Sequence, residues 1–393
     1  MDIATTIAAK ADQYAESIVA FRRYLHENPE IAMQEFKATK RILEELAKLP
    51  NIEVQDCAPG VIAILRGKKP GKTIALRGDM DALPSQEITG LPFASKVDNM
   101  CHSCGHDLHA ATILGCAKIL HDMVDEINGT VKFFFQPAEE TLQGAKHLLE
   151  KGCMENPHVD AVIGVHAWPY APAGSVALRS GPMMASADMV DITIKGKEGH
   201  AARAHLCIDP IFIAAQVISA LQAIVARQTD ALDTAVLSFG TISGGHVRNT
   251  IPSEVVMKGT IRALTPGVRA NIPRQIERIA TNVAAAFGGE AIVNYQEGSP
   301  PVINDAGMYE LVKQAATDML GAENVRPIAL PVTGGEDMAF YMEKAPGMFF
   351  RLGSTNDDPR SKLNAHNSEL IFDERALGVG MKVVCKAALD FLK

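Results

Sequence analysis

Apolar residues recur along the chain at two different periods. In residues 15–49 they follow helical spacing with a break at Asn28-Pro29, which predicts two helices joined by a proline turn. Short apolar runs that predict strands follow at residues 61–65, 73–76, 131–135 and 161–165, with helical patterns between them at 109–123 and 141–150. This alternation is typical of an α/β domain.

The middle of the chain has a different order of elements. A strand, a helix, two strands, a helix and a strand are predicted in turn at residues 189–195, 210–227, 235–242, 255–261, 268–287 and 291–295. This β-α-β-β-α-β order is the split pattern of a ferredoxin-like unit. Because Gly181-Pro182 precedes it and Pro300-Pro301 follows it, we expect an insertion of residues 184–296 in a discontinuous domain of residues 1–183 and 297–393. We interpret the insertion as a lid, and an independent binding module is the alternative.

Composition narrows the class of protein. Hydrophobic residues make up 47% and charged residues 21%, which is globular composition, and the net charge of -8 without a charged tail gives no indication of a nucleic-acid partner. The apolar stretch at residues 211–225 is interrupted by Gln216 and Gln222, and we expect no membrane span. The N-terminal residues lack the pattern of an export signal, and seven scattered cysteines suit reduced thiols. We therefore expect a soluble, cytoplasmic protein.

One short segment is unusually rich in metal-binding side chains. Six potential ligands lie within nine residues: Cys101, His102, Cys104, His106, Asp107 and His109. Cys104 and His106 are two residues apart, so both can point to one metal. The alternative is a buried thiol beside an Asp107 that caps a helix. A closed zinc site would need a second ligand pair at structural-zinc spacing, which does not follow nearby, so an open catalytic site is favoured.

Further candidate groups follow separate predicted strands. Glu139 and Glu140 come after the strand that ends at Gln136-Pro137; in a hydrolase one such carboxylate binds metal while its neighbour takes a proton from metal-bound water. A solvated helix N-terminus is the alternative. His166 ends a strand, and His366 lies in a polar loop before the C-terminal helix. With Cys104 and His106 these side chains make a plausible set for two zinc-like ions.

The inserted unit and one late turn also carry polar candidates. His200 and His205 lie in a turn-rich stretch, where exposed histidines are commonly inert. Asn249 and the later Arg262 have side chains suited to hold a carboxylate or an oxyanion. The turn Gly334-Gly335-Glu336-Asp337 is interpreted either as a helix N-cap at Asp337 or as a functional segment.

The motifs together resemble a known family. They are His26-Glu27-Asn28-Pro29-Glu30, Arg77-Gly78-Asp79-Met80-Asp81-Ala82-Leu83-Pro84, Cys104-Gly105-His106-Asp107, Gln136-Pro137-Ala138-Glu139-Glu140 and Asn249-Thr250-Ile251-Pro252. Nearly end to end, the chain resembles the metal-dependent aminoacylase and carboxypeptidase superfamily, in particular its branch of hippurate hydrolases, auxin-conjugate hydrolases and N-acetyldiaminopimelate deacetylases. The resemblance implies a zinc-peptidase-like catalytic domain with an inserted ferredoxin-like lid that also mediates dimerisation.

The same resemblance implies roles for particular residues. Two divalent metal ions, zinc first and manganese, cobalt or nickel as further possibilities, would be bound by Cys104, His106, Glu140, His166 and His366. Glu139 would be the general base. From the lid, and in some relatives from the neighbouring subunit of a homodimer, residues such as His200, Asn249 and Arg262 polarise the scissile carbonyl or hold the substrate carboxylate.

The implied substrate is an N-acyl amino acid, and a metallo-carboxypeptidase or dipeptidase is the alternative activity. A binding protein without turnover is disfavoured, because all five implied ligands and the implied base are present. Four positions depart from the family pattern: Cys101 stands where Met is usual, Ser103 where Ala is usual, Ala204 where Pro is usual before His205, and Cys207 where Gly is common. These departures affect the expected substrate preference rather than the expected chemistry.

Overall fold

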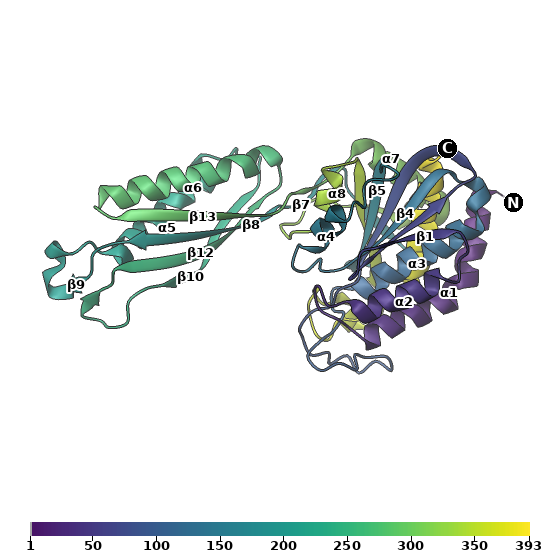
Figure 1. Cartoon of the computed structure of the whole chain (residues 1–393), viewed down its shortest axis with the longest axis horizontal. Helices are drawn as coiled ribbons and strands as arrows, with labels where there is room; N and C mark the ends of the chain where they lie inside the picture. The colour runs from purple at the N-terminus through teal and green to yellow at the C-terminus, as the bar shows by residue number, and fades with distance from the viewer. Residues whose placement is uncertain (1) are drawn as a thin grey trace. The chain divides into compact units, whose positions relative to one another are not determined.

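A computed structural model describes residues 2–393, and the chain in it packs into two compact units (Figure 1). The first contains the chain through Gly181 together with Ile303–Leu330 and Asp337–Lys393. The second contains Pro182–Val302 and the short segment Pro331–Glu336. The segment 184–296, expected to be an insertion, falls within the second unit.

A mixed sheet forms the centre of the first unit. Within residues 2–393 it has eight strands in the order β1–β2–β4–β3–β5–β16–β6–β15. Their bounds are β1 Ile52–Asp56, β2 Val61–Arg66, β3 Lys69–Asp79, β4 Asn128–Gln136, β5 Ala161–Pro172, β6 Val176–Leu178, β15 Val325–Pro327 and β16 Gly347–Thr355. The four central strands β4, β3, β5 and β16 are parallel. Phe133, Phe134 and Phe135 on β4 are all fully buried, as expected for a strand covered on both faces.

Helices cover both faces of this sheet. Their bounds are α1 Ile3–Glu27, α2 Phe36–Leu46, α3 His106–Asp122, α4 Gly144–Glu150, α7 Ala306–Leu320, α8 Ala339–Met342 and α9 Arg375–Phe391. Helices α1, α3, α7 and α9 pack against one another and share one core, to which Ile18, Ile113 and Val383 belong. On the other face the Phe134 ring lies 5.4 Å from the ring of Tyr341 in α8. The sheet is therefore buried between two helical layers.

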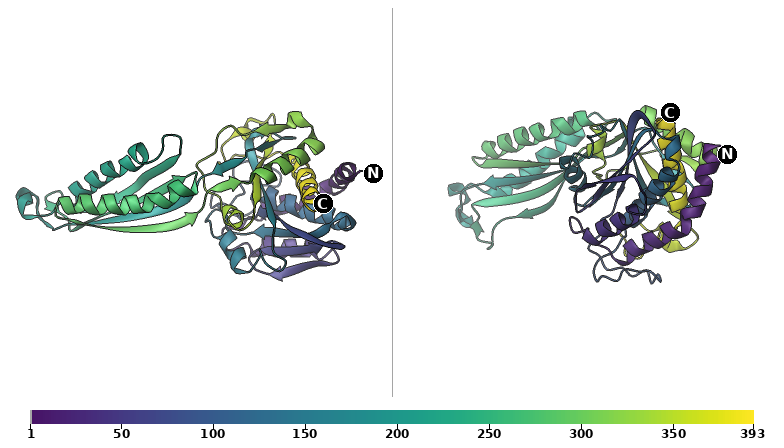
Figure 2. Two further views of the ribbon diagram at one scale, coloured as in Figure 1. Left: turned by 90° about the horizontal axis from the view of Figure 1, so that it is seen from above. Right: turned by 45° about the vertical axis from the view of Figure 1, so that its right-hand side comes forward.

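The second unit consists of two layers. Its main elements follow one another as β8 Ala187–Lys195, α5 Pro210–Arg227, β10 Ala235–Ser243, β12 Glu254–Ala263, α6 Pro266–Ala286 and β13 Glu290–Ser299. Within residues 2–393 they form a four-stranded antiparallel sheet in the order β10–β12–β8–β13. Both helices pack on one face of it, against Val190, Met257 and Ile261 (Figure 2). At one end β9 Gly199–His200 pairs with β11 Thr250–Ile251.

Helix α5 is long and apolar enough to cross a membrane by length and composition alone, and one such helix is weak evidence for a span. We expected no span because Gln216 and Gln222 interrupt the apolar run. In the structure Ile213, Val217 and Leu221 pack into the core beneath the four-stranded sheet. One side of α5 is buried, and the other side includes polar residues. This pattern is typical of a helix in a two-layer unit.

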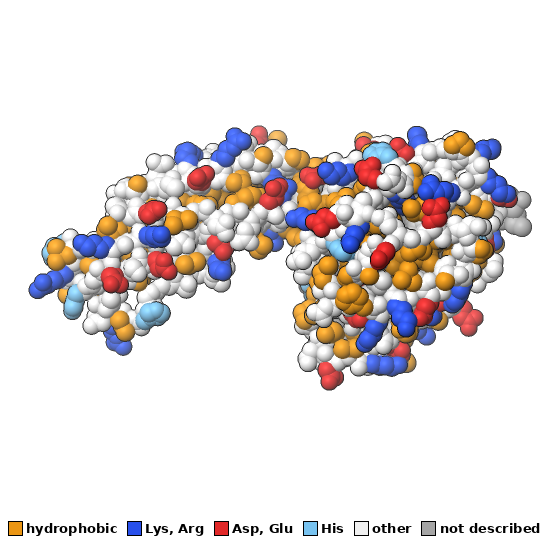
Figure 3. Space-filling view, in the orientation of Figure 1, with side chains coloured by type: hydrophobic (Ala, Val, Ile, Leu, Met, Phe, Trp, Pro, Cys, Tyr) orange, Lys and Arg blue, Asp and Glu red, His pale blue; other side chains and the backbone are white. Residues whose placement is uncertain are grey.

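Charges of both signs are mixed on the surface. On the face shown in Figure 3, Lys and Arg side chains are interspersed with Asp and Glu on both units. This agrees with a net charge of only -8 over 393 residues.

Candidate metal centre

The candidate site lies at the carboxyl ends of the parallel strands. Strand β3 ends at Asp79, which is level with Gln136 at the end of β4. On the other side of β3, Arg77 is level with Gly164 of β5, which places His166 beside the end of β3. Open α/β sheets bind their ligands at this edge, so the strand register itself brings these segments together.

Gly105 controls how the cysteine-rich segment enters helix α3. Its φ of +90° is in the left-handed region that favours glycine. A Cβ at this position would also lie 3.0 Å from the Cβ of Ala167 and 3.1 Å from Cζ of Phe372. Helix α3 then begins at His106, three residues before the start at residue 109 that the sequence pattern predicts. His106 therefore belongs to the first turn of α3, and the helix holds its backbone in place.

The structure brings all five predicted metal ligands together. They are Cys104, His106, Glu140, His166 and His366. Cys104 Sγ lies 3.5 Å from His166 Nε2, and His366 Nε2 lies 3.4 Å from Glu140 Oε1. Cys104 belongs to two groups whose ligand atoms lie within 4.8 Å of one another, one with His106 and His166 and one with Glu140 and His366.

Two buried atoms in this cluster have surroundings that fit metal ligands. His106 Nδ1 donates to Asp81 Oδ1 at 3.0 Å, which leaves Nε2 as the free ring nitrogen. Nε2 of His106 and Oε1 of Glu140 are buried, form no hydrogen bond within residues 2–393, and lie 3.8 Å apart. Buried polar atoms normally have partners, and a divalent cation would satisfy both of these. Thiolate, imidazole and carboxylate ligands suit zinc and related ions, so the side chains fit such a metal.

The surroundings of the cluster determine which of its side chains carry protons before a metal binds. Burial raises the pKa of the Cys104 thiol to about 12. Burial and the nearby Arg351 guanidinium lower the pKa of His166 well below its usual value, so its imidazole is neutral. Burial opposes a charge on His106, but the Asp79 carboxylate and its neighbours raise the pKa of this imidazole well above its usual value. A metal that binds here must displace protons from Cys104 and His106.

Glu139 lies beside the ligands and is buried, with 7% of its surface exposed. Its Oε2 atom is 3.9 Å from His106 Nε2. The expected helix 141–150 begins only at Gly144, so Glu139 and Glu140 lie in the loop between β4 and α4. The alternative interpretation of the pair as a solvated helix N-terminus is therefore wrong, because Glu139 is buried and precedes the helix by five residues.

Two further carboxylates support the cluster from β3. Asp79 Oδ1 accepts a 2.5 Å hydrogen bond from His109 Nδ1, and Asp79 Oδ2 accepts one of 2.6 Å from Arg77. His109 Nε2 in turn accepts from the backbone N–H of Ala167 at 2.6 Å, next to His166. Asp79 and Asp81 belong to one of the motifs of the sequence, but no role was predicted for them. Asp79 ends β3 and Asp81 lies two residues after it, so both lie where a strand ends, as Glu139 and Glu140 do.

Two predicted helix caps have different roles in the structure. Gly105 occupies the cap of α3, and Asp107 instead forms an ion pair with Arg22, whose Nε lies 2.6 Å from Asp107 Oδ2, and lies 2.8 Å from Nδ1 of His26. Asp337 accepts from Arg77 at 2.7 Å, and also from Gln136 Nε2 and the backbone of Ala145. Both carboxylates are fully buried, and each joins segments that are far apart in the sequence.

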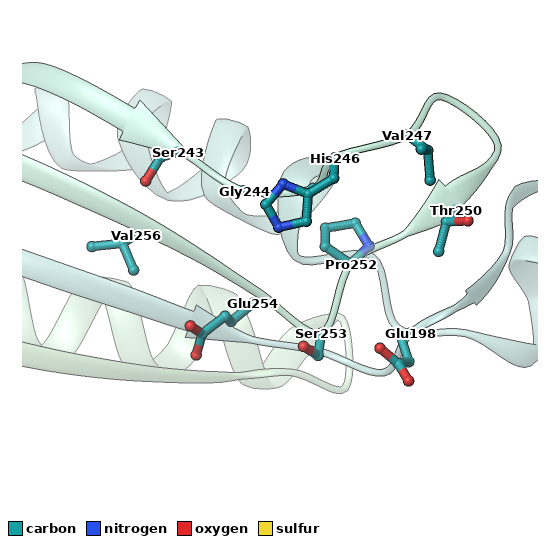
Figure 4. Close-up of a pocket in the computed structure, with 11 residues that line it drawn as sticks. Glu198, Ser243, Gly244, His246, Val247, Thr250, Pro252, Ser253, Glu254 and Val256 are labelled. Atoms are coloured by element: carbon teal, nitrogen blue, oxygen red, sulfur yellow. The ribbon is translucent and has the colours of Figure 1, made fainter.

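The second unit contains the three predicted substrate-binding candidates, at two places. His200 is exposed, and its Nδ1 accepts from the backbone N–H of Ala202 at 3.1 Å. The carbonyl of Asn249 accepts from the N–H of Ala201, so these two candidates are neighbours. Figure 4 shows the hollow of about 460 Å³ beside them, lined by side chains that include Glu198, His246, Thr250 and Glu254.

Arg262 lies near the opposite end of β12, roughly 26 Å from the strand's first residue at about 3.3 Å per residue. It lines a second hollow of about 440 Å³ with Met189, Asp191 and Lys258. Its guanidinium donates to the carbonyl of Ile261 and forms no ion pair within residues 2–393, and burial lowers its pKa. A half-buried guanidinium that forms no direct ion pair within residues 2–393 is suited to bind an anion.

Comparisons with known proteins agree with this geometry. The sequence profile of peptidase family M20/M25/M40 matches residues 75–390. N-acetylcysteine deacetylase of Bacillus subtilis is 40% identical over 379 residues, which cover 96% of this chain and 97% of that protein. Thermostable carboxypeptidase 2 of Saccharolobus solfataricus is 37% identical, with coverage of 100% and 99%. The crystal structure of the Bacillus subtilis YXEP protein, described as a dinuclear metal-binding peptidase of the M20 family, superposes with a TM-score of 0.83 at 36% identity, with coverage of 97% and 99%.

Proposed function

Because the chain belongs to peptidase family M20/M25/M40, we propose that it is a metal-dependent amidohydrolase that cleaves the amide bond of N-acyl amino acids. The products are a carboxylic acid and an amino acid. The observation that carries the proposal is the ligand cluster, in which the buried atoms His106 Nε2 and Glu140 Oε1 form no hydrogen bond within residues 2–393, next to the buried carboxylate of Glu139.

The proposed ligands of two divalent ions, zinc being the preferred metal, are Cys104, His106, Glu140, His166 and His366. That Cys104 belongs to two ligand groups supports a pair of ions rather than one. Such ions supply a water of lowered pKa and a polarised carbonyl.

Glu139 is the proposed general base. Its carboxylate takes a proton from the attacking water, whose oxygen adds to the carbonyl carbon of the amide. When the C–N bond breaks, Glu139 gives that proton to the departing nitrogen, which leaves as the amine of the amino acid. Burial of Glu139 beside the ligands supports this role, because proton transfer requires the base within hydrogen-bonding reach of the water.

The second unit is a proposed ferredoxin-like lid and dimerisation domain. Its β-α-β-β-α-β chain order and β10–β12–β8–β13 strand order support the ferredoxin-like assignment. His200 would polarise the scissile carbonyl, while Asn249 and Arg262 would hold the substrate carboxylate. Exposed Ile211 and Phe212 at the start of α5 support a homodimer.

The compartment is proposed to be the cytoplasm. All seven cysteines are free thiols, which suits a reducing environment.

A metallo-carboxypeptidase or dipeptidase activity is the second candidate. The 37% identity to a thermostable carboxypeptidase over 100% of this chain favours it. Both activities use the same hydrolytic chemistry and differ in whether an acyl group or an amino acid precedes the cleaved bond. The ligand cluster serves either, so the difference must be measured.

The test is a substrate panel with the zinc-loaded full chain. N-acetyl, N-benzoyl and glycyl derivatives of the same amino acids are compared by kcat/KM. Our proposal expects the acyl derivatives to be cleaved at least about tenfold faster, equivalent to 1.4 kcal/mol of transition-state stabilisation. Faster cleavage of the glycyl dipeptides would favour the second candidate. If no substrate is hydrolysed while metal is bound, neither activity is correct.

A further inference from the structure

The loop that carries Glu139 and Glu140 has an unusual backbone. It joins β4, which ends at Gln136, to α4, which begins at Gly144. Ala138 has a φ of +53° and Leu142 one of +56°, both in the left-handed region that disfavours residues with a Cβ. Such a conformation persists when surrounding groups hold it, and it is often found at functional sites.

Glu35 is the group that holds Ala138. Its Oε1 accepts from the backbone N–H of Ala138 at 2.7 Å, and its side chain is fully buried. Glu35 occupies the N-cap position of α2, but its carboxylate forms no cap hydrogen bond with that helix. The carboxylate instead reaches a loop that lies 103 positions later in the chain.

Hydrogen bonds from Thr39 fix the backbone of Glu35. Its backbone carbonyl accepts from both the N–H and the hydroxyl of Thr39, at 3.0 and 2.6 Å. The Thr39 hydroxyl oxygen accepts from the N–H of Gly60 at 2.9 Å. The start of α2 is thereby tied to the segment before β2. Glu35 can therefore act as a rigid acceptor for Ala138.

A different carboxylate holds Glu140. Asp81 Oδ2 accepts from the Glu140 N–H at 3.0 Å, while Asp81 Oδ1 holds His106. The two backbone N–H groups on either side of Glu139 thus have separate acceptors, one from Glu35 and one from Asp81. Glu35 therefore holds the backbone before the proposed base Glu139, whereas Asp81 holds the backbone of the proposed metal ligand Glu140.

We propose that Glu35 is a positioning residue for Glu139: its hydrogen bond keeps Ala138 in the left-handed conformation and so directs the Glu139 side chain. The inference rests on the proposed function, in which Glu139 is the base. It requires an acceptor oxygen that reaches Ala138, and it does not require a negative charge. Burial and the nearby Asp81 raise the pKa of Glu35 to about 7, in keeping with a role that tolerates the neutral form.

The test compares Glu35→Ala, Glu35→Gln and Glu35→Asp in the zinc-loaded full chain, with the best substrate of the panel. The amide oxygen of Gln retains the acceptor at the same reach, so kcat should stay within about threefold of wild type. Ala removes the acceptor and Asp withdraws it by one methylene. Both should lower kcat by about 10- to 100-fold, the cost expected from a small misplacement of a catalytic group, with KM and bound metal nearly unchanged.

Glu45→Ala is the matched control. Glu45 lies on the same helix and is buried, but its carboxylate binds Lys118 at 2.8 Å and does not contact the loop. This variant should keep kcat. If Glu35→Ala does not fold, the other two variants still test the inference. Glu35→Gln keeps the length of the side chain and loses its charge, whereas Glu35→Asp keeps the charge and is shorter. The inference is overturned if Gln is as slow as Asp, if Glu35→Ala retains full kcat, or if kcat in the Glu35 and Glu45 variants falls only in proportion to the folded fraction.

Hydrogen exchange separates this inference from the proposed function. In the metal-loaded protein, the Ala138 amide should exchange faster in Glu35→Ala than in wild type and should remain protected in Glu35→Gln. This measurement needs no substrate. If wild type hydrolyses nothing, the proposed function fails while the exchange data still report on the hydrogen bond. If wild type is active and the amide is equally protected in Glu35→Ala, the inference alone fails.

Discussion

The two regions that carry predicted catalytic histidines differ in how their geometry is set. His106 is fully buried, and the carboxylates of Asp79, Glu139 and Glu140 lie 3.8 to 3.9 Å from its Nε2. His200 is exposed, and its imidazole bonds only to the backbone of its own turn within residues 2–393. The ligand cluster is thus preorganised within one unit, whereas His200 can act only when a second surface or a substrate approaches it.

The physical reason is burial. A buried polar atom needs a partner, so Asp81 holds the ring of His106, and His109 holds the backbone next to His166. An exposed side chain exchanges its partners with water and carries no such requirement. Substitutions in the two regions should therefore have different effects: those in the ligand cluster should change metal binding or stability, and those at exposed positions should change turnover alone.

Glu139→Gln should reduce kcat by about 10² to 10⁴, because general-base catalysis contributes that much. Bound metal, measured by elemental analysis, should remain at the wild-type ratio, since Glu140 and the other proposed ligands are intact. Glu150→Gln, at the exposed end of α4, is the control and should leave kcat unchanged. Near-normal turnover of the Glu139 variant with metal bound would remove Glu139 from the mechanism.

His200→Ala should reduce kcat by about 10² to 10³, the usual cost of one lost oxyanion donor. Its free energy of unfolding should stay within about 0.5 kcal/mol of wild type, because the side chain is on the surface. His205→Ala, in the same exposed turn, should be neutral in both measurements. A loss of stability equal to that of a buried ligand variant would contradict the contrast between the two regions.

Cys104→Ser should weaken metal binding by at least about tenfold, because a thiolate is exchanged for a poorer ligand. The measurement is metal content after dialysis against a weak chelator. Cys101→Ser is the matched control, since Cys101 is a buried thiol that belongs to none of the ligand groups found within residues 2–393. Full metal occupancy in the Cys104 variant would exclude the thiol as a ligand.

The apparent affinity for zinc should rise with pH between about 6 and 8 in wild type. Burial raises the pKa of Cys104 to about 12, so the thiol keeps its proton until the metal displaces it. A higher pH makes that displacement easier, and binding should release protons that a pH indicator can count. In Cys104→Ser fewer protons should be released per metal bound; an unchanged number would assign the released protons to other groups.

Arg262→Ala should raise KM by about tenfold with little change in kcat, because the loss of a charge-assisted contact to a substrate carboxylate weakens binding. Lys258→Ala is the control from the same hollow, where Lys258 is already 3.8 Å from the Asp191 carboxylate. The measurement is a steady-state comparison of both variants. Equal effects in both variants would indicate a general electrostatic contribution rather than a specific contact.

Much of the fold could be predicted from periodicity. The segments expected at residues 210–227 and 235–242 are α5 at Pro210–Arg227 and β10 at Ala235–Ser243. The errors lie at element ends, where local pattern is weak. Helix α1 starts at Ile3 because Asp2 caps it by accepting from the N–H of Thr5. The apolar pattern predicted a start near residue 15, because a capping side chain is not part of that pattern.

In the metal centre, residue types and motif order determined the candidates: Cys104, His106, Glu139, Glu140, His166 and His366 all lie in one cluster. The carboxylates that hold these side chains and their loop in place were not predicted. Asp79, Asp81 and Glu35 act through hydrogen bonds to residues 25 to 103 positions away. Their roles depend on which strands and loops become neighbours, and a local pattern carries no information about that.

The sequence by itself therefore determined the elements and the chemistry of this protein, because helical and strand periods, cysteine, histidine and paired glutamates are local properties of the chain. Only the tertiary structure decided which carboxylates hold the side chains of the proposed metal ligands and which hold the backbone of the loop that carries Glu139. Parallel pairing of β3, β4 and β5 brings distant segments level at one sheet edge, and burial there favours partners for the polar atoms. That requirement turned Glu35, an ordinary residue before a helix in the sequence, into the acceptor that holds the loop of Glu139.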